Sequence, residues 1–151
     1  MIHLYRAALV DEIPKIVEMK YKMYEETGMA NRLLPDFHKL VQEDYRDLYQ
    51  AGIAQHFVIE IDNQLIACAG AFIRDDAPYR YLKLRSYGLI GDVFVEPPFR
   101  KKGYARMLTN AALEWFSEKN IRLFRLHASD TARHLYESLG FTPTPEMGLF
   151  R

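Results

Sequence analysis

The chain of 151 residues is 49% hydrophobic and carries 20 basic and 20 acidic side chains, so its formal net charge is zero. These values predict one soluble domain over residues 1–151 and disfavour a nucleic-acid-binding protein, which usually carries a clear basic excess. No apolar run of about 18 residues could span a membrane, and the start of the chain lacks the layout of a signal peptide.

Cys68 is the only cysteine, which excludes an internal disulfide and a cysteine-based zinc site. Its apolar neighbours favour a buried small residue over a reactive thiol. We therefore expect a cytoplasmic protein that depends on neither a membrane nor a metal ion.

The first half of the chain predicts a strand, two helices and a β-hairpin. The helices show apolar residues at spacings of three and four, and the hairpin turn is indicated by Asp62-Asn63. The expected elements are a strand at 2–8, helices at 11–26 and 36–50, and strands at 54–61 and 65–73.

The second half predicts alternating strands and helices after a polar loop at 74–85. The two prolines at 97 and 98 end the first of these strands, because proline cannot donate to a sheet ladder. The expected elements are strands at 87–95 and 121–128, helices at 103–119 and 131–139, and one or two closing strands within 141–151. This order predicts an α/β fold with a mixed sheet.

The most informative stretch is the turn Arg100-Lys101-Lys102-Gly103-Tyr104-Ala105, which lies between a strand and a helix. Such a turn aims backbone N–H groups and the positive end of a helix at one point, where an anion such as a phosphate is stabilised. Gly103 has no Cβ and allows close approach of a ligand. The turn is neither a Walker A loop nor a dinucleotide-binding fingerprint, because the required spacings are absent.

This turn resembles the Arg/Gln-x-x-Gly-x-Gly/Ala signature of the GCN5-related N-acetyltransferase (GNAT) superfamily. A second block, Leu126-His127-Ala128-Ser129 followed by residues 135–141, resembles the family's later motif, in which a tyrosine precedes Gly-Phe. The order of elements is similar along essentially the whole chain. The resemblance implies a mostly antiparallel sheet of about six to seven strands with about four helices, splayed between the fourth and fifth strands.

The resemblance also implies acetyl-CoA as the acyl donor and a residue-by-residue assignment of its site. Backbone N–H groups of residues 100–105 would hold the pyrophosphate, with help from the lysine charges. In the segment Val93-Phe94-Val95, the backbone of the two valines would pair with the pantetheine arm. That pairing needs the two strands to separate after residue 93, typically at a β-bulge.

Two residues of the later block have alternative interpretations. Tyr136 either packs its ring in a helix or, by the family's pattern, protonates the departing thiolate. Ser129 either caps the following helix or contacts the cofactor.

The acceptor amine must lose a proton, and the candidates for the base are Asp92, Glu25 and Glu26, or a water relay. The resemblance also implies that Glu25 and Glu26 lie near the loop that shapes the acceptor pocket, so both are expected to contact the substrate. For each carboxylate the alternative is a solvated side chain. Without a cysteine at the motifs, direct transfer in a ternary complex is favoured over an acyl-enzyme.

The acceptor itself carries no motif: a small amine, an amino acid, an antibiotic, or a protein N-terminus or lysine all fit. A homodimer, common in the family, also fits. The alternative function is a catalytically silent acyl-CoA-binding module that regulates a partner.

Overall fold

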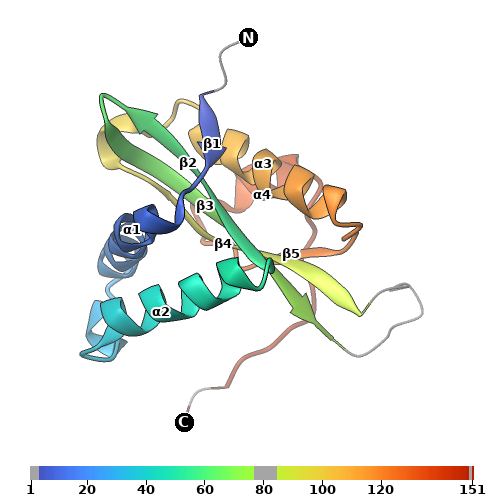
Figure 1. Ribbon diagram of the computed structural model, residues 1–151. Coiled ribbons are helices and arrows are strands. Elements are labelled where there is room, and N and C mark those ends of the chain that lie inside the picture. The colour runs from blue at the N-terminus through green and yellow to red at the C-terminus, as the bar shows by residue number, and fades with distance from the viewer. Residues whose placement is uncertain (1–3, 77–84, 150) are drawn as a thin grey trace.

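The computed structural model describes residues 4–76, 85–149 and 151. A sheet of five strands separates α1 and α2 on one face from α3 and α4 on the other (Figure 1). The strands are β1 Tyr5–Ala7, β2 Ala54–Ile61, β3 Gln64–Asp75, β4 Ser86–Val95 and β5 Phe124–Leu126. The helices are α1 Ile13–Glu26, α2 Phe37–Gln50, α3 Tyr104–Glu118 and α4 Arg133–Ser138, with short 3-10 turns at Val10–Glu12, Ala30–Arg32 and Pro97–Phe99.

The strands are ordered β1-β2-β3-β4-β5 across the sheet. The first three pairings are antiparallel, and β4 pairs with β5 in parallel. The β2–β3 hairpin turns at Asp62 and Asn63, whose φ angles of 51° and 63° are those that a two-residue hairpin turn requires. The predicted hairpin and mixed α/β sheet are therefore confirmed.

The expected closing strands are wrong. Residues 141–149 form neither helix nor strand, so the described part of the chain holds five strands, fewer than the six to seven expected. Pro143 and Pro145 explain the difference, because two prolines in alternate positions remove two backbone donors from any ladder. The strand expected at 121–128 is also shorter, and most of the loop expected at 74–85 lies outside the described residues.

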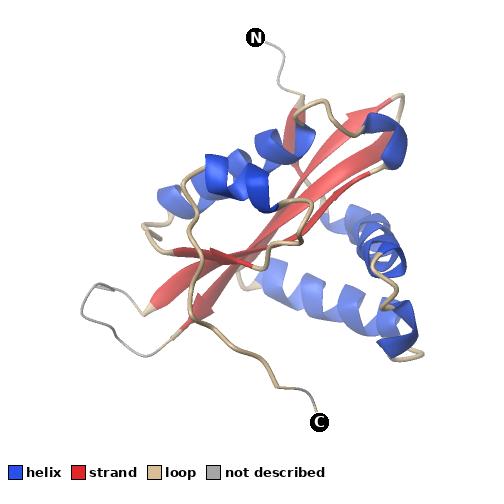
Figure 2. Ribbon diagram, turned by 180° about the vertical axis from the view of Figure 1, so that it is seen from behind, coloured by secondary structure: helices blue, strands red, loops and turns tan. Residues whose placement is uncertain are grey.

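Figure 2 shows the sheet between its helices. Buried hydrophobic side chains pack on both faces of the sheet. Below α1 and α2, the fully buried side chains of Ile13, Ile16 and Val17 pack against β2 and β3. On the other face Phe116 of α3 lies over Gly88 of β4, where an added Cβ would stand 2.7 Å from the phenyl ring. This close approach lets α3 lie flat on β4 and fixes where its N-terminus points.

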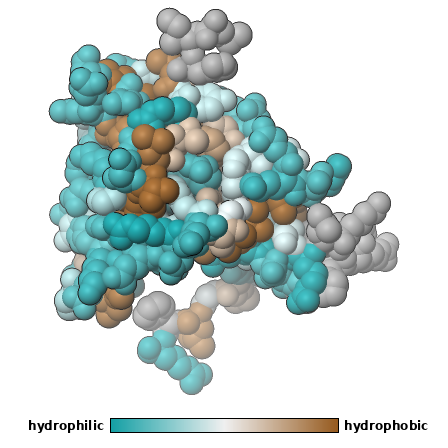
Figure 3. Space-filling view, in the orientation of Figure 1, coloured by the Kyte–Doolittle hydropathy of each residue, from teal (hydrophilic) through white to brown (hydrophobic). Residues whose placement is uncertain are grey.

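The outer surface is mainly hydrophilic, with small separate apolar patches in the orientation of Figure 3. The most exposed large apolar side chains belong to Met147 and Leu149, near the end of the chain. The described part of the chain contains no helix long and apolar enough to cross a membrane.

Candidate active site

The parallel pairing between β4 and β5 stops halfway along β4. It joins Gly88 to Phe124 and ends where Ile90 meets Leu126, although β4 continues beside β3 as far as Val95. The second half of β4 therefore has one open edge. The splay predicted between the fourth and fifth strands is confirmed, and the last paired residue is 90 rather than 93.

A β-bulge lies at the point where the two strands separate. On β3, Gly70 pairs with Gly91 and Cys68 with Phe94, so Asp92 and Val93 together stand opposite one residue of β3. Asp92 has a φ angle of 54°, in the left-handed region. An extra residue of this kind bends a strand and increases its twist, which here carries β4 away from β5.

The open edge presents backbone groups at alternate residues. The N–H of Glu96 donates to Ile66 O on β3 at 2.8 Å, so Val95 and Val93 turn their backbone groups the other way, toward the open edge. The carbonyl of Val95 already accepts a hydrogen bond from Arg100 Nε at 2.7 Å. The N–H of Val95 and the backbone groups of Val93 face this edge, where no strand of the described residues pairs with them.

The turn that follows β4 leads directly into the N-terminus of α3, with open space beside Gly103. Lys101 and Gly103 have left-handed φ angles of 64° and 83°, and α3 begins at the next residue. The first intrahelical bond runs from Met107 N to Gly103 O, and no side chain caps the helix. An added Cβ at Gly103 would meet no atom within 4 Å. The first N–H groups of α3, from Tyr104 and Ala105 onward, are thus available to an anion.

The side chain of Arg100 turns away from this space. Its Nη2 lies 2.6 Å from Glu26 Oε1, and its guanidinium stands 5.5 Å from the centre of the Phe94 ring. Arg100 therefore links the end of β4 to the end of α1 through its ion pair with Glu26. The other expected acid at this position, Glu25, is exposed and forms no ion pair with the described residues.

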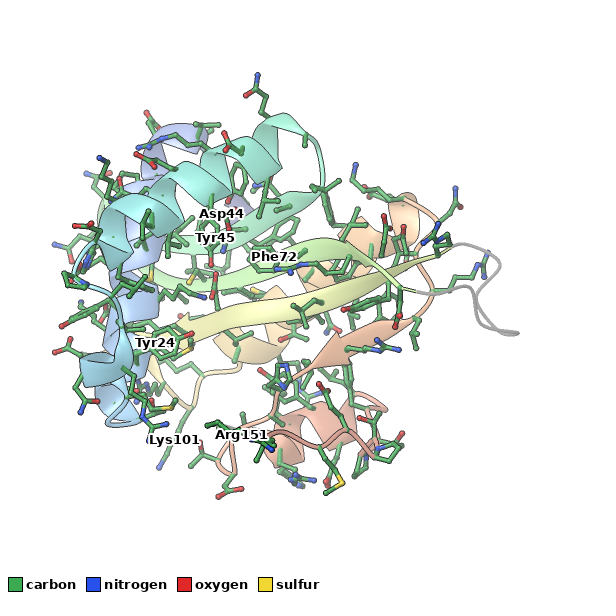
Figure 4. The ribbon with its side chains drawn as sticks, turned by 90° about the horizontal axis from the view of Figure 1, so that it is seen from below. Tyr24, Asp44, Tyr45, Phe72, Lys101 and Arg151 are labelled. Carbon is green, nitrogen blue, oxygen red and sulfur yellow. The ribbon has the colours of Figure 1, made fainter. Side chains whose placement is uncertain are left out.

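Lys101 and Lys102 carry the charge beside the helix N-terminus, and both are exposed. Figure 4 places Lys101 at the outside of the molecule. These lysines, rather than Arg100, are the cations that an anion at this turn would meet.

Tyr136 lies on α4 beside a hollow of about 970 Å³ between β4, β5 and the last residues of the chain. Its ring packs edge-on against Phe141 with centroids 6.0 Å apart, and Leu89 and Leu126 line the same hollow. Burial raises the pKa of Tyr136, and its hydroxyl forms no hydrogen bond with the described residues. A protonated phenol with no internal partner can donate to a ligand.

Ser129 precedes α4 by one turn. Its Oγ accepts a hydrogen bond from Ala132 N at 3.3 Å, and its carbonyl accepts from Arg133 N at 3.0 Å. Ser129 therefore shapes the start of α4, on which Tyr136 stands, and it is exposed.

Asp92 is the centre of a buried polar cluster on the opposite face of β4. Its carboxylate accepts hydrogen bonds from Lys20 Nζ of α1, Tyr45 OH of α2 and His56 Nε2 of β2, the last at 2.8 Å. Burial alone would raise the pKa of Asp92, but the His56 hydrogen bond and the Lys20 charge outweigh it and hold this pKa below its usual range. Asp92 is therefore an ionised carboxylate at neutral pH.

Sequence reasoning found Asp92 but missed its partners. Lys20, Tyr45 and His56 come from three elements and share no spacing with Asp92 along the chain, so no local pattern marks them. Figure 4 labels Tyr45 of this cluster and Phe72 beside it, and the centroids of their rings lie 5.6 Å apart.

Cys68 is fully buried and unpaired with another cysteine, as expected. Its Sγ lies 3.1 Å from the carbonyl oxygen of Asp92, and burial raises the pKa of the thiol. The thiol thus stays protonated and donates to the carbonyl of Asp92, the residue at the bulge. Within the described residues, no group of three His, Cys, Asp or Glu could hold a metal ion.

The sequence model of the acetyltransferase (GNAT) family matches residues 20–141. The chain belongs to this family. Membership confirms the predicted acyltransferase activity and acetyl-CoA as the co-substrate.

Solved structures share the fold along nearly the whole chain. A predicted acetyltransferase from Clostridium acetobutylicum, crystallised with acetyl-CoA, is 25% identical with a TM-score of 0.88, over 97% of this chain and 94% of its own. A GCN5-related N-acetyltransferase from Ralstonia eutropha is 24% identical with a TM-score of 0.83, over 97% of both chains.

An aminoglycoside 6′-N-acetyltransferase from Acinetobacter haemolyticus is 21% identical with a TM-score of 0.71, over 97% of this chain and 96% of its own. No curated protein matches the chain.

Proposed function

We propose that this protein transfers the acetyl group of acetyl-CoA to a primary amine by direct attack within a ternary complex. The proposal rests on one observation: the open edge of β4 and the N-terminal N–H groups of α3 lie next to each other along the chain. The open edge of β4, from Val93 to Val95, leads through one tight turn into the free N–H groups of α3. An extended arm that ends in a pyrophosphate fits such a surface.

The residues of this surface divide the binding between them. The backbone N–H groups of residues 101–105, with the charges of Lys101 and Lys102, would hold the pyrophosphate. Val93 and Val95 would pair with the pantetheine arm through their backbone. Phe94 would support this edge from the other face of the sheet, because its side chain packs in the α1–α2 layer and its ring lies under the Arg100 guanidinium. When bound, acetyl-CoA supplies an activated thioester to the attacking amine.

Tyr136 is the proton donor in this proposal. Its raised pKa keeps the phenol protonated at neutral pH, and its hydroxyl has no partner among the described residues that would compete for the proton. It stands on α4 beside a hollow that is also lined by Leu126, the partner of Ile90 in the last pair that joins β4 to β5. A thiolate leaving group would take its proton from this hydroxyl.

The amine proton is better assigned to water than to a carboxylate. Asp92, the expected base, already accepts three hydrogen bonds and has a lowered pKa. At neutral pH, release of a proton from a lysine-like amine of pKa about 10.4 to bulk solvent through water costs about 4–5 kcal/mol, whereas transfer to a carboxyl group of pKa about 4 costs more than about 8 kcal/mol. Glu26 is paired with Arg100, and Glu25 is solvated.

The acceptor is an amine whose further identity stays open. Structural neighbours named as aminoglycoside and glucosamine-6-phosphate N-acetyltransferases are 15–21% identical and share the fold alone. Both names support the choice of an amine, and they do not distinguish among amines.

One experiment separates this proposal from a silent acyl-CoA-binding module. The protein is mixed with acetyl-CoA and a panel of small amines, aminoglycosides and peptides, and the release of free thiol is measured. We expect thiol release that depends on one class of amine. Binding of acetyl-CoA by calorimetry without amine-dependent thiol release across the panel would favour the silent module.

A further inference from the structure

The bulge in β4 contains Asp92, a type of residue that rarely adopts the backbone conformation found here. Asp92 adopts a left-handed φ angle of 54° although Gly91, directly before it, is the residue that would adopt this conformation without steric cost. Side chains other than glycine hold such a conformation only where the surroundings fix it. Contacts from both ends of Asp92 do so here.

The carboxylate end is held by three elements of the α1–α2 side. Lys20 binds Oδ1, while Tyr45 and His56 bind Oδ2. The carbonyl end is held by the thiol of Cys68 on β3. The bulge is therefore attached to α1, α2, β2 and β3 at once.

His56 also contacts Tyr49. The hydroxyl of Tyr49 accepts a hydrogen bond from His56 N at 3.0 Å and lies 2.7 Å from Nδ1. Because an ionised carboxylate can only accept, His56 Nε2 donates to Asp92. Lys20 supplies the charge that balances this carboxylate. No buried side-chain nitrogen or oxygen of the described residues lacks a partner.

The space around His56 is shaped for its ring. An added Cβ at Gly70 would stand 2.8 Å from His56 Nε2 and 2.7 Å from the Phe72 ring. The imidazole is fully buried between Tyr45 and Phe72, with ring centroids 4.9 and 5.4 Å away. The ring therefore cannot shift without moving the sheet, and the donor to Asp92 is rigid.

A buried ion pair of this kind contributes little net stability, because well-packed apolar side chains often do as well. What this one contributes is a single arrangement of the bulge. The bulge lies between Ile90, the last residue paired with β5, and Val93, the first residue of the open edge. The direction of that edge depends on the conformation of the residue between them.

We propose that Lys20 and His56, acting through Asp92, are positioning residues that fix the β4 bulge and thereby the edge that receives the acyl donor. This inference rests on the proposed function, because it assigns the edge to acetyl-CoA. It gives Asp92 a place in the reaction other than that of a base.

The test compares Asp92→Asn with Val17→Ala. The first keeps the size of the side chain and removes the charge that gathers the donors. The second removes packing from α1, where Val17 is also fully buried, and takes away none of the hydrogen-bonding groups around Asp92. Both are measured at a temperature where thermal denaturation shows them folded.

Two readouts are used: acetyl-CoA affinity by calorimetry, and amide hydrogen exchange of residues 91–96 without ligand. For Asp92→Asn we expect affinity weakened about tenfold, the equivalent of one lost positioning hydrogen bond, and faster exchange of this segment. For Val17→Ala we expect affinity within about twofold of wild type at equal loss of thermal stability.

If Asp92→Asn does not fold, the pair Lys20→Met with Asp92→Asn replaces it, since that variant buries no unpaired charge. The same losses are expected. Affinity within twofold of wild type with unchanged exchange would overturn the positioning role, and so would equal losses in Val17→Ala.

The failure of this inference differs from the failure of the proposed function. A wild-type protein that binds acetyl-CoA and releases no thiol with any amine contradicts the proposed transfer, while the affinity ratio still decides the role of the bulge. A wild-type protein that turns over, with Asp92→Asn unaffected, contradicts the positioning role alone.

Discussion

The two sides of β4 use different chemical groups. Toward β5 and α3, the strand and the following turn offer backbone N–H and carbonyl groups at an open edge, and Gly103 is the residue whose identity matters there. Toward α1 and α2, the same strand presents the Asp92 carboxylate to side chains from three other elements. The first side should tolerate substitutions that keep the backbone, whereas the second should respond to the loss of single side-chain atoms.

The largest effect is expected from Lys20→Ala on the α1–α2 side. The substitution leaves the Asp92 carboxylate buried without its balancing charge, which should lower the free energy of unfolding by about 3–5 kcal/mol. Denaturant unfolding measures the change. The matched control is Lys22→Ala on the same helix, which breaks the more exposed pair with Glu96 and should cost about 0.2–1 kcal/mol. Equal losses of unfolding free energy in Lys20→Ala and Lys22→Ala would contradict the sensitivity expected of the side of β4 that depends on single side chains.

Tyr136→Phe should have the next largest effect, and on turnover rather than on folding. Loss of the hydroxyl removes the proton donor, so kcat should fall about 100-fold while the affinity for acetyl-CoA stays within about twofold. Steady-state kinetics at saturating substrates measures kcat. Tyr21→Phe, in the α1–α2 layer, is the control for loss of a tyrosine hydroxyl away from the hollow. An unchanged kcat in Tyr136→Phe would show that this ring only packs against Phe141.

Much of the backbone side of β4 could be predicted from the sequence, because its signals are local. A turn with Gly103 before an amphipathic run defines the start of α3, and Asp62-Asn63 defines the hairpin. The splay between β4 and β5 was predicted from the family resemblance. The three-residue length of β5 was predicted neither by the local signals nor by the resemblance.

The side-chain cluster could not be predicted in the same way. Lys20 and His56 meet Asp92 across separations of 72 and 36 residues, and a single lysine or histidine within an amphipathic pattern carries no sign of its partner. The expected closing strands fail for a different reason, because Pro143 and Pro145 remove two backbone donors from any ladder at 141–149.

Gly103→Val tests the side of β4 that offers backbone groups to a ligand. A valine at a φ angle of 83° strains the turn and places methyl groups in the space above the helix N-terminus. The affinity for acetyl-CoA, measured by calorimetry, should weaken about tenfold or more. Gly28→Val is the matched control, because Gly28 also has a left-handed φ angle, 72°, and open space around it, but lies after α1. If both variants lose affinity equally, backbone strain rather than blocking of the anion site is the cause.

The smallest effect is expected from the charges beside that turn. Lys101→Ala and Lys102→Ala leave every backbone N–H in place, so each should weaken acetyl-CoA binding only about two- to fivefold at low salt, by loss of a solvent-exposed charge. The loss should shrink as the ionic strength of the titration rises, because salt screens exposed charges within a few ångströms at high concentration. Lys39→Ala, on the exposed surface of α2, is the control. A loss of more than about tenfold from either lysine, or one independent of salt, would mean that this side of β4 also depends on particular side chains, and the contrast between its two sides would then not hold.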